Sequence, residues 1–427
     1  MDVSLCRAAS ITPEGTSRAP LPIRAGRIGA SLAARAYRVD LHDHLIFPGL
    51  INAHEHLHVN TVPPLNTGAR FPNSYAWIEA FQAHFEEPAV IAALQVPKEL
   101  RLRHGALKNL LAGTTFVVHH DPWHPALDAT NFPVALLRDY GWSYALGWPD
   151  YGPPVQQSFA ATPADRPWLI HLAEGTDATA QAELARLDQL GCLAANSVLI
   201  HGVGLREQDV DRVIVSGAAV VWCPTSNRAL LGRSLDPRRL YAAGRLALGS
   251  DSRLSGARDL LEEMRGIAAR GELKPMQLLK LVTTQAARIL RQPLRGSLAS
   301  GAPADLVIVE DRGGEARSLV DIERNQIRAV VRDGVPRIAD PDFADWFAAT
   351  GMETVPVMLD GKPKLLARPL ADPALIALEP GLERIADRNE REPDLTKDAL
   401  TNNALTNNAL TNNALTNNAL TIDARCN

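Results

Sequence analysis

The sequence predicts an α/β protein of the (β/α)8-type TIM barrel class, shortened around the fourth strand, with a small β-sandwich domain built from both chain ends. Between about residues 45 and 296, short apolar runs alternate with amphipathic, helix-like stretches. Polar residues follow these runs at a regular stride: His171 and His201 are 30 residues apart, Cys223 follows 22 residues later and Asp251 another 28. This is the stride of successive β-α units, and seven or eight such units close a barrel.

Seven apolar runs are interpreted as buried strands. In chain order they are LIFPGLINAH, TTFVVHH, WSYALGW, WLIHLAE, SVLIHG, AAVVWCP and RLALGSD. A helix is predicted over 177–191, because leucines recur at helical spacing and Gly191 supplies a C-terminal stop. Only 27 residues separate Tyr144, in the third strand, from His171, in the fifth. The fourth strand is therefore expected near Val155–Phe159, or the barrel is incomplete there.

The pattern changes outside the predicted barrel of residues 45–296. Residues 1–44 and 297–368 hold short strand signals and turns, and together they are predicted to form the small β-domain. Residues 371–427 are expected to be a disordered tail. Within it ALTNN occurs four times in tandem over residues 399–418, and a five-residue period matches neither a helix nor a strand.

Composition narrows the classes of partner. The 427 residues suffice for a large catalytic domain and a smaller accessory one. A net charge of −4 gives no reason to expect nucleic acid or an anionic membrane as partner, so we expect a small-molecule substrate; a homo-oligomer is compatible with the sequence. Scattered cysteines, no signal-peptide pattern and no membrane-length apolar run favour a cytoplasmic protein.

The segment PGLINAHEH, at the first apolar run, carries the strongest chemical signal. On a strand, residues i and i+2 point to the same face, about 6.6 Å apart. His54 and His56 could therefore share one metal ion inside a barrel. The alternative is a pair of surface histidines. His42 and His44 fit that description better, because they precede the Pro-Gly turn in a charged stretch.

Three further strand ends carry residues of ligand or catalytic chemistry. His171 ends the apolar run WLI, where barrel enzymes place functional groups. Glu174 reaches the same centre only if the chain turns just before it, which the glycine that follows favours; the alternative is a surface glutamate at a helix start. His201 and Asp251 follow SVLI and RLALGS in the same way. Each alone could be a core residue or a helix cap, but together they predict one shared centre.

These motifs resemble the amidohydrolase superfamily. PGLINAHEH, HLAE, the IHG at His201, the CPTSN at Cys223–Asn227 and the GSD at Asp251 occur in the expected order. The segment Gly296–Glu310 resembles the one that returns the chain to the small β-domain. The resemblance spans about residues 27–340 and is strongest to the single-metal, deaminase-like branch, which includes the S-adenosylhomocysteine, guanine and cytosine deaminases and the triazine hydrolases.

The resemblance implies a role for each residue of the centre. Glu174 is implied to be the proton shuttle. His201 is implied to be a catalytic partner of the attacking water or the substrate, and Asp251 to help orient the nucleophile. The implied metal ligands are His54, His56, His171 and Asp251.

One divalent metal ion is expected. Two-metal members of the superfamily usually bridge their ions with a carboxylated lysine on the fourth strand, and no lysine occurs between Lys108 and Lys274. Zn²⁺ suits three imidazoles and a carboxylate, whereas Fe²⁺ or Mn²⁺ could occupy the same site.

Four residues are predicted to bind the substrate: His120, His124, Asn227 and Trp77. The two histidines belong to the sequence HHDPWH at 119–124, which is unlike the deaminase motifs. A second metal site and plain polar loop structure are the alternatives for that sequence.

The predicted activity is metal-dependent hydrolysis of carbon–nitrogen bonds other than peptide bonds, with deamination of an amino-substituted nitrogen heterocycle favoured. Glu174 would take a proton from water and pass it to the leaving nitrogen. Alternatives on the same centre are ring opening of a cyclic amide and dechlorination. An alternative of another class is a non-catalytic metal-binding scaffold, which the presence of all the expected ligands disfavours.

Overall fold

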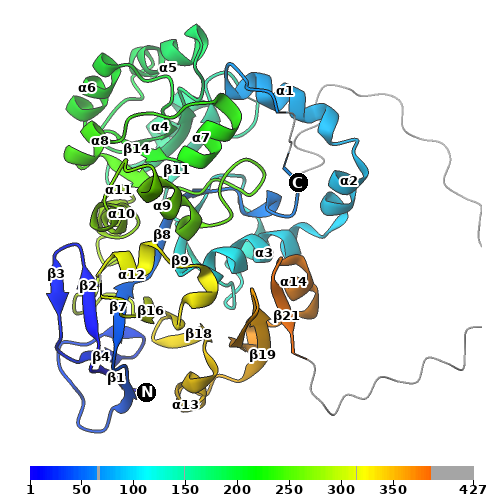
Figure 1. Cartoon of the computed structure of the whole chain (residues 1–427). Helices are drawn as coiled ribbons and strands as arrows, with labels where there is room; N and C mark the ends of the chain where they lie inside the picture. Colours follow the sequence, from blue (N-terminus) through cyan, green and yellow to red (C-terminus); the bar gives the residue numbers. More distant parts are fainter. Residues whose placement is uncertain (65–67, 149, 314, 386–427) are drawn as a thin grey trace, which may run out of the picture.

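Eight parallel strands form two sheets in the computed structural model, which describes residues 1–385 apart from 65–67, 149 and 314 (Figure 1). One sheet has the order β10-β9-β8 and the other the order β11-β12-β13-β14-β15, and β15 contacts β8. The predicted α/β fold with parallel strands is thus confirmed. The strands are β8 (Leu50–Glu55), β9 (Thr114–His119), β10 (Ala135–Leu136), β11 (Gly141–Ala145), β12 (Trp168–Leu172), β13 (Ser197–His201), β14 (Ala219–Trp222) and β15 (Leu246–Leu248).

Helices connect these strands and pack against them (Figure 1). The predicted helix is confirmed: Asp177 caps it by accepting a hydrogen bond from the backbone N–H of Ala180 at 3.0 Å, and Gly191 follows with a φ of 72°. None of the described helices is long and apolar enough to cross a membrane. The helices are α1 (Ser74–His84), α2 (Pro88–Gln95), α3 (Lys98–Leu111), α4 (Val155–Ala161), α5 (Ala178–Gln189), α6 (Glu207–Ser216), α7 (Pro224–Leu231), α8 (Arg238–Ala242), α9 (Leu260–Ala269), α10 (Pro275–Leu281), α11 (Thr284–Ile289), α12 (Arg317–Val320), α13 (Ala344–Ala349) and α14 (Pro373–Leu378).

The predicted fourth strand near Val155–Phe159 is wrong. That segment is the helix α4, which starts directly after Pro154, a residue that suits a helix start. The fourth parallel strand is β11, which pairs directly with β12, and the shortened strand is the third, because β10 has only two residues. Two residues are too few to show any hydrophobic period, so the sequence pattern indicates the run WSYALGW as the third strand.

The run LIFPGLINAH forms two strands that belong to different sheets. β7 (His44–Pro48) and β8 are separated by Gly49, where the chain passes close to Thr115. A Cβ on Gly49 would lie 2.3 Å from Oγ1 of Thr115, so only glycine fits this approach. His42, before β7, is exposed as predicted, whereas His44 is half-buried and accepts a hydrogen bond from a guanidinium.

Both chain ends contribute to one nine-stranded sheet, in which β7 pairs with the antiparallel β16 and the parallel β2 (Figure 1). The two ends therefore meet in space, while the division into separate domains stays a prediction. A four-stranded sheet of the order β5-β4-β1-β6 is formed by N-terminal residues. The strands are β1 (Val3–Cys6), β2 (Ala9–Thr12), β3 (Gly15–Ser17), β4 (Leu21–Arg24), β5 (Arg27–Ile28), β6 (Tyr37–Asp40), β16 (Leu306–Glu310), β17 (Ala329–Arg332), β18 (Val335–Ala339), β19 (Thr354–Leu359), β20 (Lys362–Ala367) and β21 (Leu382–Arg384).

The predicted start of the tail at residue 371 is wrong. α14 and β21 follow it, and between them Glu379 is buried. The Glu379 carboxylate accepts hydrogen bonds from Nε2 of His104 at 2.8 Å and from Arg253 at 2.7 and 2.9 Å, and it pairs with Arg324. These partners hold the pKa of Glu379 well below its usual value, although burial alone would raise it. The ALTNN repeats lie outside the described residues.

Two truncations should therefore have opposite outcomes. A chain that ends at residue 395 should keep its melting temperature, because the repeat sequence has no apolar face that could join a core. A chain that ends at residue 370 leaves the guanidinium groups of Arg253 and Arg324 without Glu379, which should cost about 3–5 kcal/mol of unfolding free energy. Thermal unfolding of both chains checks this, and equal melting temperatures would contradict it.

Candidate metal centre

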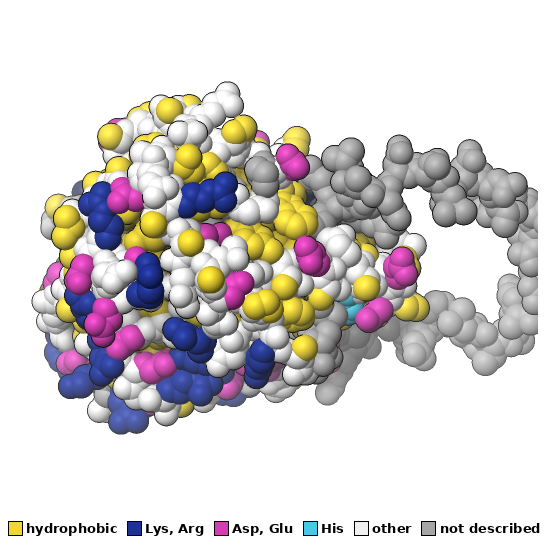
Figure 2. Space-filling view, turned by 90° about the horizontal axis from the view of Figure 1, so that it is seen from above, with side chains coloured by type: hydrophobic (Ala, Val, Ile, Leu, Met, Phe, Trp, Pro, Cys, Tyr) yellow, Lys and Arg dark blue, Asp and Glu magenta, His cyan; other side chains and the backbone are white. Residues whose placement is uncertain are grey.

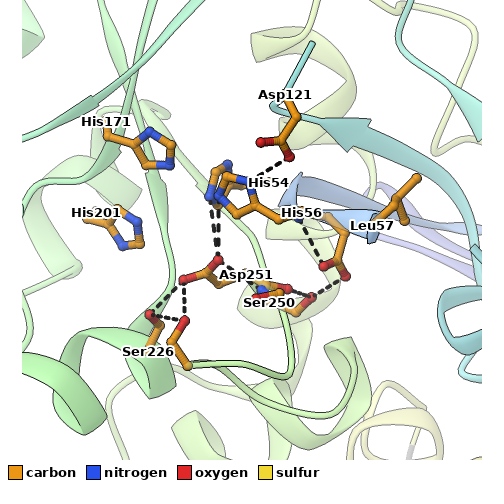
Figure 3. Close-up of polar contacts among 12 residues, drawn as sticks. His54, His56, Leu57, Asp121, His171, His201, Ser226, Ser250 and Asp251 are labelled. Atoms are coloured by element: carbon orange, nitrogen blue, oxygen red, sulfur yellow. Dashed lines mark hydrogen bonds and ion pairs between the residues drawn. The ribbon is translucent and has the colours of Figure 1, made fainter. Parts of the chain in front are cut away.

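The carboxyl ends of four parallel strands bring four histidines and an aspartate together (Figure 3). His54 and His56 lie at the end of β8, His171 on β12, His201 on β13, and Asp251 three residues after β15. The candidate ligand atoms of His54, His56 and His171 lie within 4.8 Å of one another, and so do those of His54, His201 and Asp251. The structure thus brings together every predicted ligand.

His54 shows whether the site fits a cation. Its side chain is fully buried, and neither ring nitrogen has a hydrogen-bond partner among the described residues. A buried polar atom without a partner is costly. Burial, together with the neighbouring histidines, holds the pKa of His54 well below its usual value, so the ring is neutral, which is the form that binds metals. These residues therefore fit a divalent cation.

The rings of His56 and His171 are each anchored through Nδ1. The Nδ1 of His171 lies 3.0 Å from the backbone carbonyl of Tyr144, which can only accept, so this nitrogen donates. The Nδ1 of His56 lies 2.8 Å from Oδ2 of Asp121. Such a bond fixes the ring and leaves Nε2 as the atom available to a metal ion.

Asp251 supplies a carboxylate to the same centre. Its Oδ1 lies 3.8 Å from Nε2 of both His54 and His56, and its Oδ2 accepts a hydrogen bond from Oγ of Ser226 at 2.7 Å (Figure 3). Burial alone would raise the pKa of Asp251, but His56 and His201 outweigh it and hold this pKa below its usual value. The carboxylate is therefore charged and suited to a cation.

Glu174 lies against His201. Its Oε1 is 3.4 Å from Nε2 of His201, whose Nδ1 is 2.8 Å from Oδ1 of Asn227. Burial raises the pKa of Glu174, which makes this carboxylate a better proton acceptor. Asn227 is buried behind His201 and is not among the residues that line the cavity described below. Asn227, predicted to bind substrate, therefore contacts His201 and does not line the cavity.

The turn that Glu174 requires is present, and it stores backbone strain. Ala173 has a φ of 53°, and His201 and Asp251, at two other strand ends, have φ values of 74° and 55°. A positive φ is uncommon for residues other than glycine and costs on the order of 1–3 kcal/mol. Such strain concentrates at functional sites, and here it turns three strand ends into the cavity.

Glu183, on α5, supports this turn, and sequence reasoning missed it. Its Oε2 accepts a hydrogen bond from the backbone N–H of Ala173 at 2.6 Å, and the hydroxyl of Tyr75 donates to its Oε1. Burial raises the pKa of Glu183 to about 7. In the sequence Glu183 is one polar residue in an amphipathic helix, which normally indicates a solvent-exposed position.

A buried ion pair holds the other face of β8. Glu55, between the two histidines, accepts hydrogen bonds from Nζ of Lys108 at 2.6 Å and Nδ2 of Asn109 at 3.0 Å, both on α3. Its other oxygen accepts from the backbone N–H of His56 at 3.1 Å. Glu55 and Lys108 are both fully buried. The strand that carries the histidine pair is therefore tied to α3 by charge.

Lys108→Met should lower the free energy of unfolding by about 3–5 kcal/mol, because it leaves the Glu55 carboxylate buried without a cation. The matched control is Lys280→Met on the exposed face of α10, which should change stability by less than about 0.5 kcal/mol. Denaturant unfolding measures both. Adding Glu55→Gln to Lys108→Met should recover part of the loss, and a purely additive double variant would contradict the pairing.

A cavity that is partly open to solvent lies over the centre, with room for the centres of water-sized molecules over about 100 Å³. Its floor includes Glu174, Asp251 and the three histidines 56, 171 and 201. Trp77, predicted to bind substrate, lines this cavity.

His120 and His124 do not line the cavity, contrary to prediction. His120 is fully buried behind His171, with 4.4 Å between the two ring centroids, and donates to a backbone carbonyl of β11. His124 caps the short 3-10 helix Pro125–Asp128, where its Nδ1 accepts from the backbone N–H of Ala126 at 3.2 Å. Because β9 ends at His119, these residues follow the strand end, where the strand alternation no longer sets side-chain direction.

A second buried group, made of His58, His119 and Asp121, is where the alternative of a second metal site can be examined. The Nδ1 atoms of His58 and His119 lie 3.5 and 3.6 Å from Oδ2 of Asp121. However, this oxygen already pairs with His56, and Nδ1 of His119 accepts a hydrogen bond from the backbone N–H of Leu57 at 3.3 Å. We therefore interpret Asp121 as the group that orients His56.

The fold and the centre define an α/β protein with a histidine–aspartate site at the carboxyl ends of parallel strands. Residues 150–362, just under half of the chain, match the amidohydrolase family. The predicted resemblance is thus confirmed.

Curated relatives match parts of the chain. A 5-methylthioadenosine/S-adenosylhomocysteine deaminase of Nitratidesulfovibrio vulgaris is 30% identical over 163 residues, which are 34% of this chain and 37% of the relative. An aminodeoxyfutalosine deaminase of Deinococcus radiodurans is 46% identical over 71 residues, 16% of this chain and 17% of the relative. In these matches the chain therefore covers well under half of each relative's own length.

Solved structures match more of the chain at lower identity. A zinc-bound adenosine deaminase from Xanthomonas campestris has a TM-score of 0.60 at 20% identity and covers 82% of this chain and 98% of its own. An atrazine chlorohydrolase from Arthrobacter aurescens, complexed with zinc, has a TM-score of 0.63 at 16% identity, with coverages of 82% and 99%. These likenesses show a shared fold.

Proposed function

We propose that the chain is a metal-dependent hydrolase that deaminates an amino-substituted nitrogen heterocycle and releases ammonia. The observation that carries the proposal is the placement of Glu174, 3.4 Å from His201, in the cavity that Asp251 and the histidine cluster also line. The similarity of residues 150–362 to the amidohydrolase family and the named deaminases among the relatives support it.

His54, His56, His171 and Asp251 would hold one divalent ion, for which we favour zinc. Three imidazoles and a carboxylate suit Zn²⁺, and zinc is bound in both of the similar structures described above. When bound, such an ion lowers the pKa of water toward 7 and polarises the substrate.

The residues of the chain would handle the proton. Glu174 takes a proton from the attacking water and delivers it to the leaving nitrogen, and its raised pKa suits both transfers. Nε2 of His201 is held toward Glu174 by Asn227 and orients the water or the ring of the substrate.

The proposal extends to the fold of the chain and to its location in the cell. We infer that β8 to β15 form one (β/α)8-type barrel, since β15 contacts β8 and the similar structures share the fold. The nine-stranded sheet and the four-stranded sheet would make the small β-sandwich domain. The unpaired thiols of Cys6, Cys192 and Cys223 suit a cytoplasmic location.

An ammonia-release screen tests the proposal. Metal-loaded protein is incubated with aminated purines, pyrimidines, triazines and pterins, and with cyclic amides and chlorinated triazines for the two alternative hydrolyses. Ammonia from at least one aminated ring is the expected result. Turnover of the cyclic amide or chlorinated compounds without ammonia release would replace deamination by one of those reactions.

A further inference from the structure

Aromatic side chains form two walls of the cavity. Along α1 and its C-terminal cap, Trp77, Phe81 and Phe85 recur at intervals of four residues, and the ring centroids lie 5.3 Å apart in the first pair and 4.8 Å apart in the second. On another wall the rings of Tyr144 and Tyr151 lie 4.7 Å apart. The space above the metal centre is thus shaped for flat or aliphatic groups.

The charged side chains of this cavity are all carboxylates, apart from the histidines. Asp121, Glu174 and Asp251 line it, and no lysine or arginine does so among the described residues. Of the two neighbouring guanidinium groups, Arg253 pairs with the buried Glu379, whereas Arg70 is exposed outside the lining and donates to the backbone carbonyl of Ala229. In the view from above, lysine and arginine side chains gather on the left, whereas the side of α1 and α2 shows hydrophobic and acidic side chains (Figure 2).

An anionic substituent would find no fixed cation beyond the metal centre. A carboxylate or phosphate that enters such a cavity loses its hydration, meets three carboxylates and gains no ion pair. A neutral apolar substituent instead gains contact with the rings of Trp77 and Phe81 and loses little. The cavity would therefore select substrates by the charge of a substituent that lies away from the reacting carbon. We call this selection the specificity filter.

We propose that the substrate is an amino-heterocycle whose substituent is uncharged and apolar or aromatic, and that the cavity rejects analogues with a carboxylate or phosphate on that substituent. This inference rests on the proposed deaminase function. Applied to the compounds in the name of one relative, it favours 5-methylthioadenosine, whose thioether end is neutral, over S-adenosylhomocysteine, whose zwitterionic amino-acid end includes a carboxylate.

Matched pairs of compounds test the filter on the metal-loaded full chain. The pairs are 5-methylthioadenosine with its carboxymethylthio analogue, and aminated triazines and pyrimidines that carry a benzyl or a carboxybenzyl group. The neutral member of the pair that reacts should have a kcat/KM about 100-fold higher. Equal rates, or a faster charged member, would overturn the filter while leaving the deaminase function in place.

Binding separates the two possible failures. If no compound releases ammonia, the proposed function fails, and calorimetric titration of the same pairs still tests the filter. At least one neutral member should then bind more tightly than its charged partner by about tenfold or more. Equal affinities, or no binding by any neutral member, would overturn the filter.

A charge placed in the wall should change the preference. Phe81→Arg and, independently, Leu254→Arg each put a guanidinium on the lining and should shift the ratio of kcat/KM, or of affinity, toward the charged member by about tenfold. Phe81→Leu is the control that keeps the wall apolar and should leave the ratio near its original value. Melting temperatures identify any variant that fails to fold, and two folded arginine variants with an unchanged ratio would contradict the filter.

Discussion

Replacing Glu174 by glutamine is expected to lower kcat by about 100-fold or more while metal content stays close to that of the unaltered protein. Glutamine keeps the shape and hydrogen-bonding capacity of the side chain but cannot take up a proton at neutral pH. Glu174 lies 3.4 Å from His201 and is not in either of the groups whose ligand atoms converge on His54. Its loss should therefore disable proton transfer and leave the metal site filled.

The matched variant Glu174→Asp distinguishes chemistry from packing. It retains a titratable carboxyl on a side chain shorter by one methylene, so it should recover part of the lost kcat. Steady-state kinetics measures the kcat of each preparation, and elemental analysis measures its metal content. If Glu174→Gln keeps most of its kcat with metal bound and chemistry rate-limiting, the proposed proton path is wrong.

Asp251→Asn should lose both metal and turnover. Asp251 is the carboxylate of the predicted ligand set, and its Oδ1 lies 3.8 Å from Nε2 of His54 and of His56. An amide keeps the size of the side chain, but it accepts hydrogen bonds at only one of the two positions and loses the charge that a divalent ion requires. We expect most of the metal to be absent after dialysis and kcat to fall in proportion to the metal lost.

Asp121→Asn is the control for this variant. Asp121 reaches the centre only through Nδ1 of His56, at 2.8 Å, so its change should weaken metal affinity by about 10–100-fold without abolishing it. Competition with a chelator measures both affinities. A larger loss of metal affinity in Asp121→Asn than in Asp251→Asn would mean that Asp121 is the metal ligand and Asp251 the supporting residue.

The strand ends could be predicted because a polar residue that directly follows a buried strand leaves a local signal in the sequence. Each of His54, His171 and Asp251 follows an apolar run, and the stride between such runs reveals the repeated unit. The structure confirms the strands that carry them. The two-residue strand β10 leaves no such signal, so the sequence pattern places the shortening at the fourth strand instead of the third.

The support around the centre could not be predicted, because it depends on contacts between distant segments. Glu183 reaches Ala173, and Glu379 joins α14 to Arg253 across 126 residues of chain. In the sequence each is an ordinary polar residue. The aromatic wall left a weak signal, the four-residue spacing of Trp77 and Phe81, which also fits an ordinary core-facing helix.

The metal content of protein purified without added metal tests the central claim most directly. We predict about one divalent ion per chain, because His54, His56, His171 and Asp251 converge on one centre. The lone pair of His119 and the carboxylate of Asp121 are already engaged. Elemental analysis that finds two ions per chain, or none even after incubation with zinc, would contradict it.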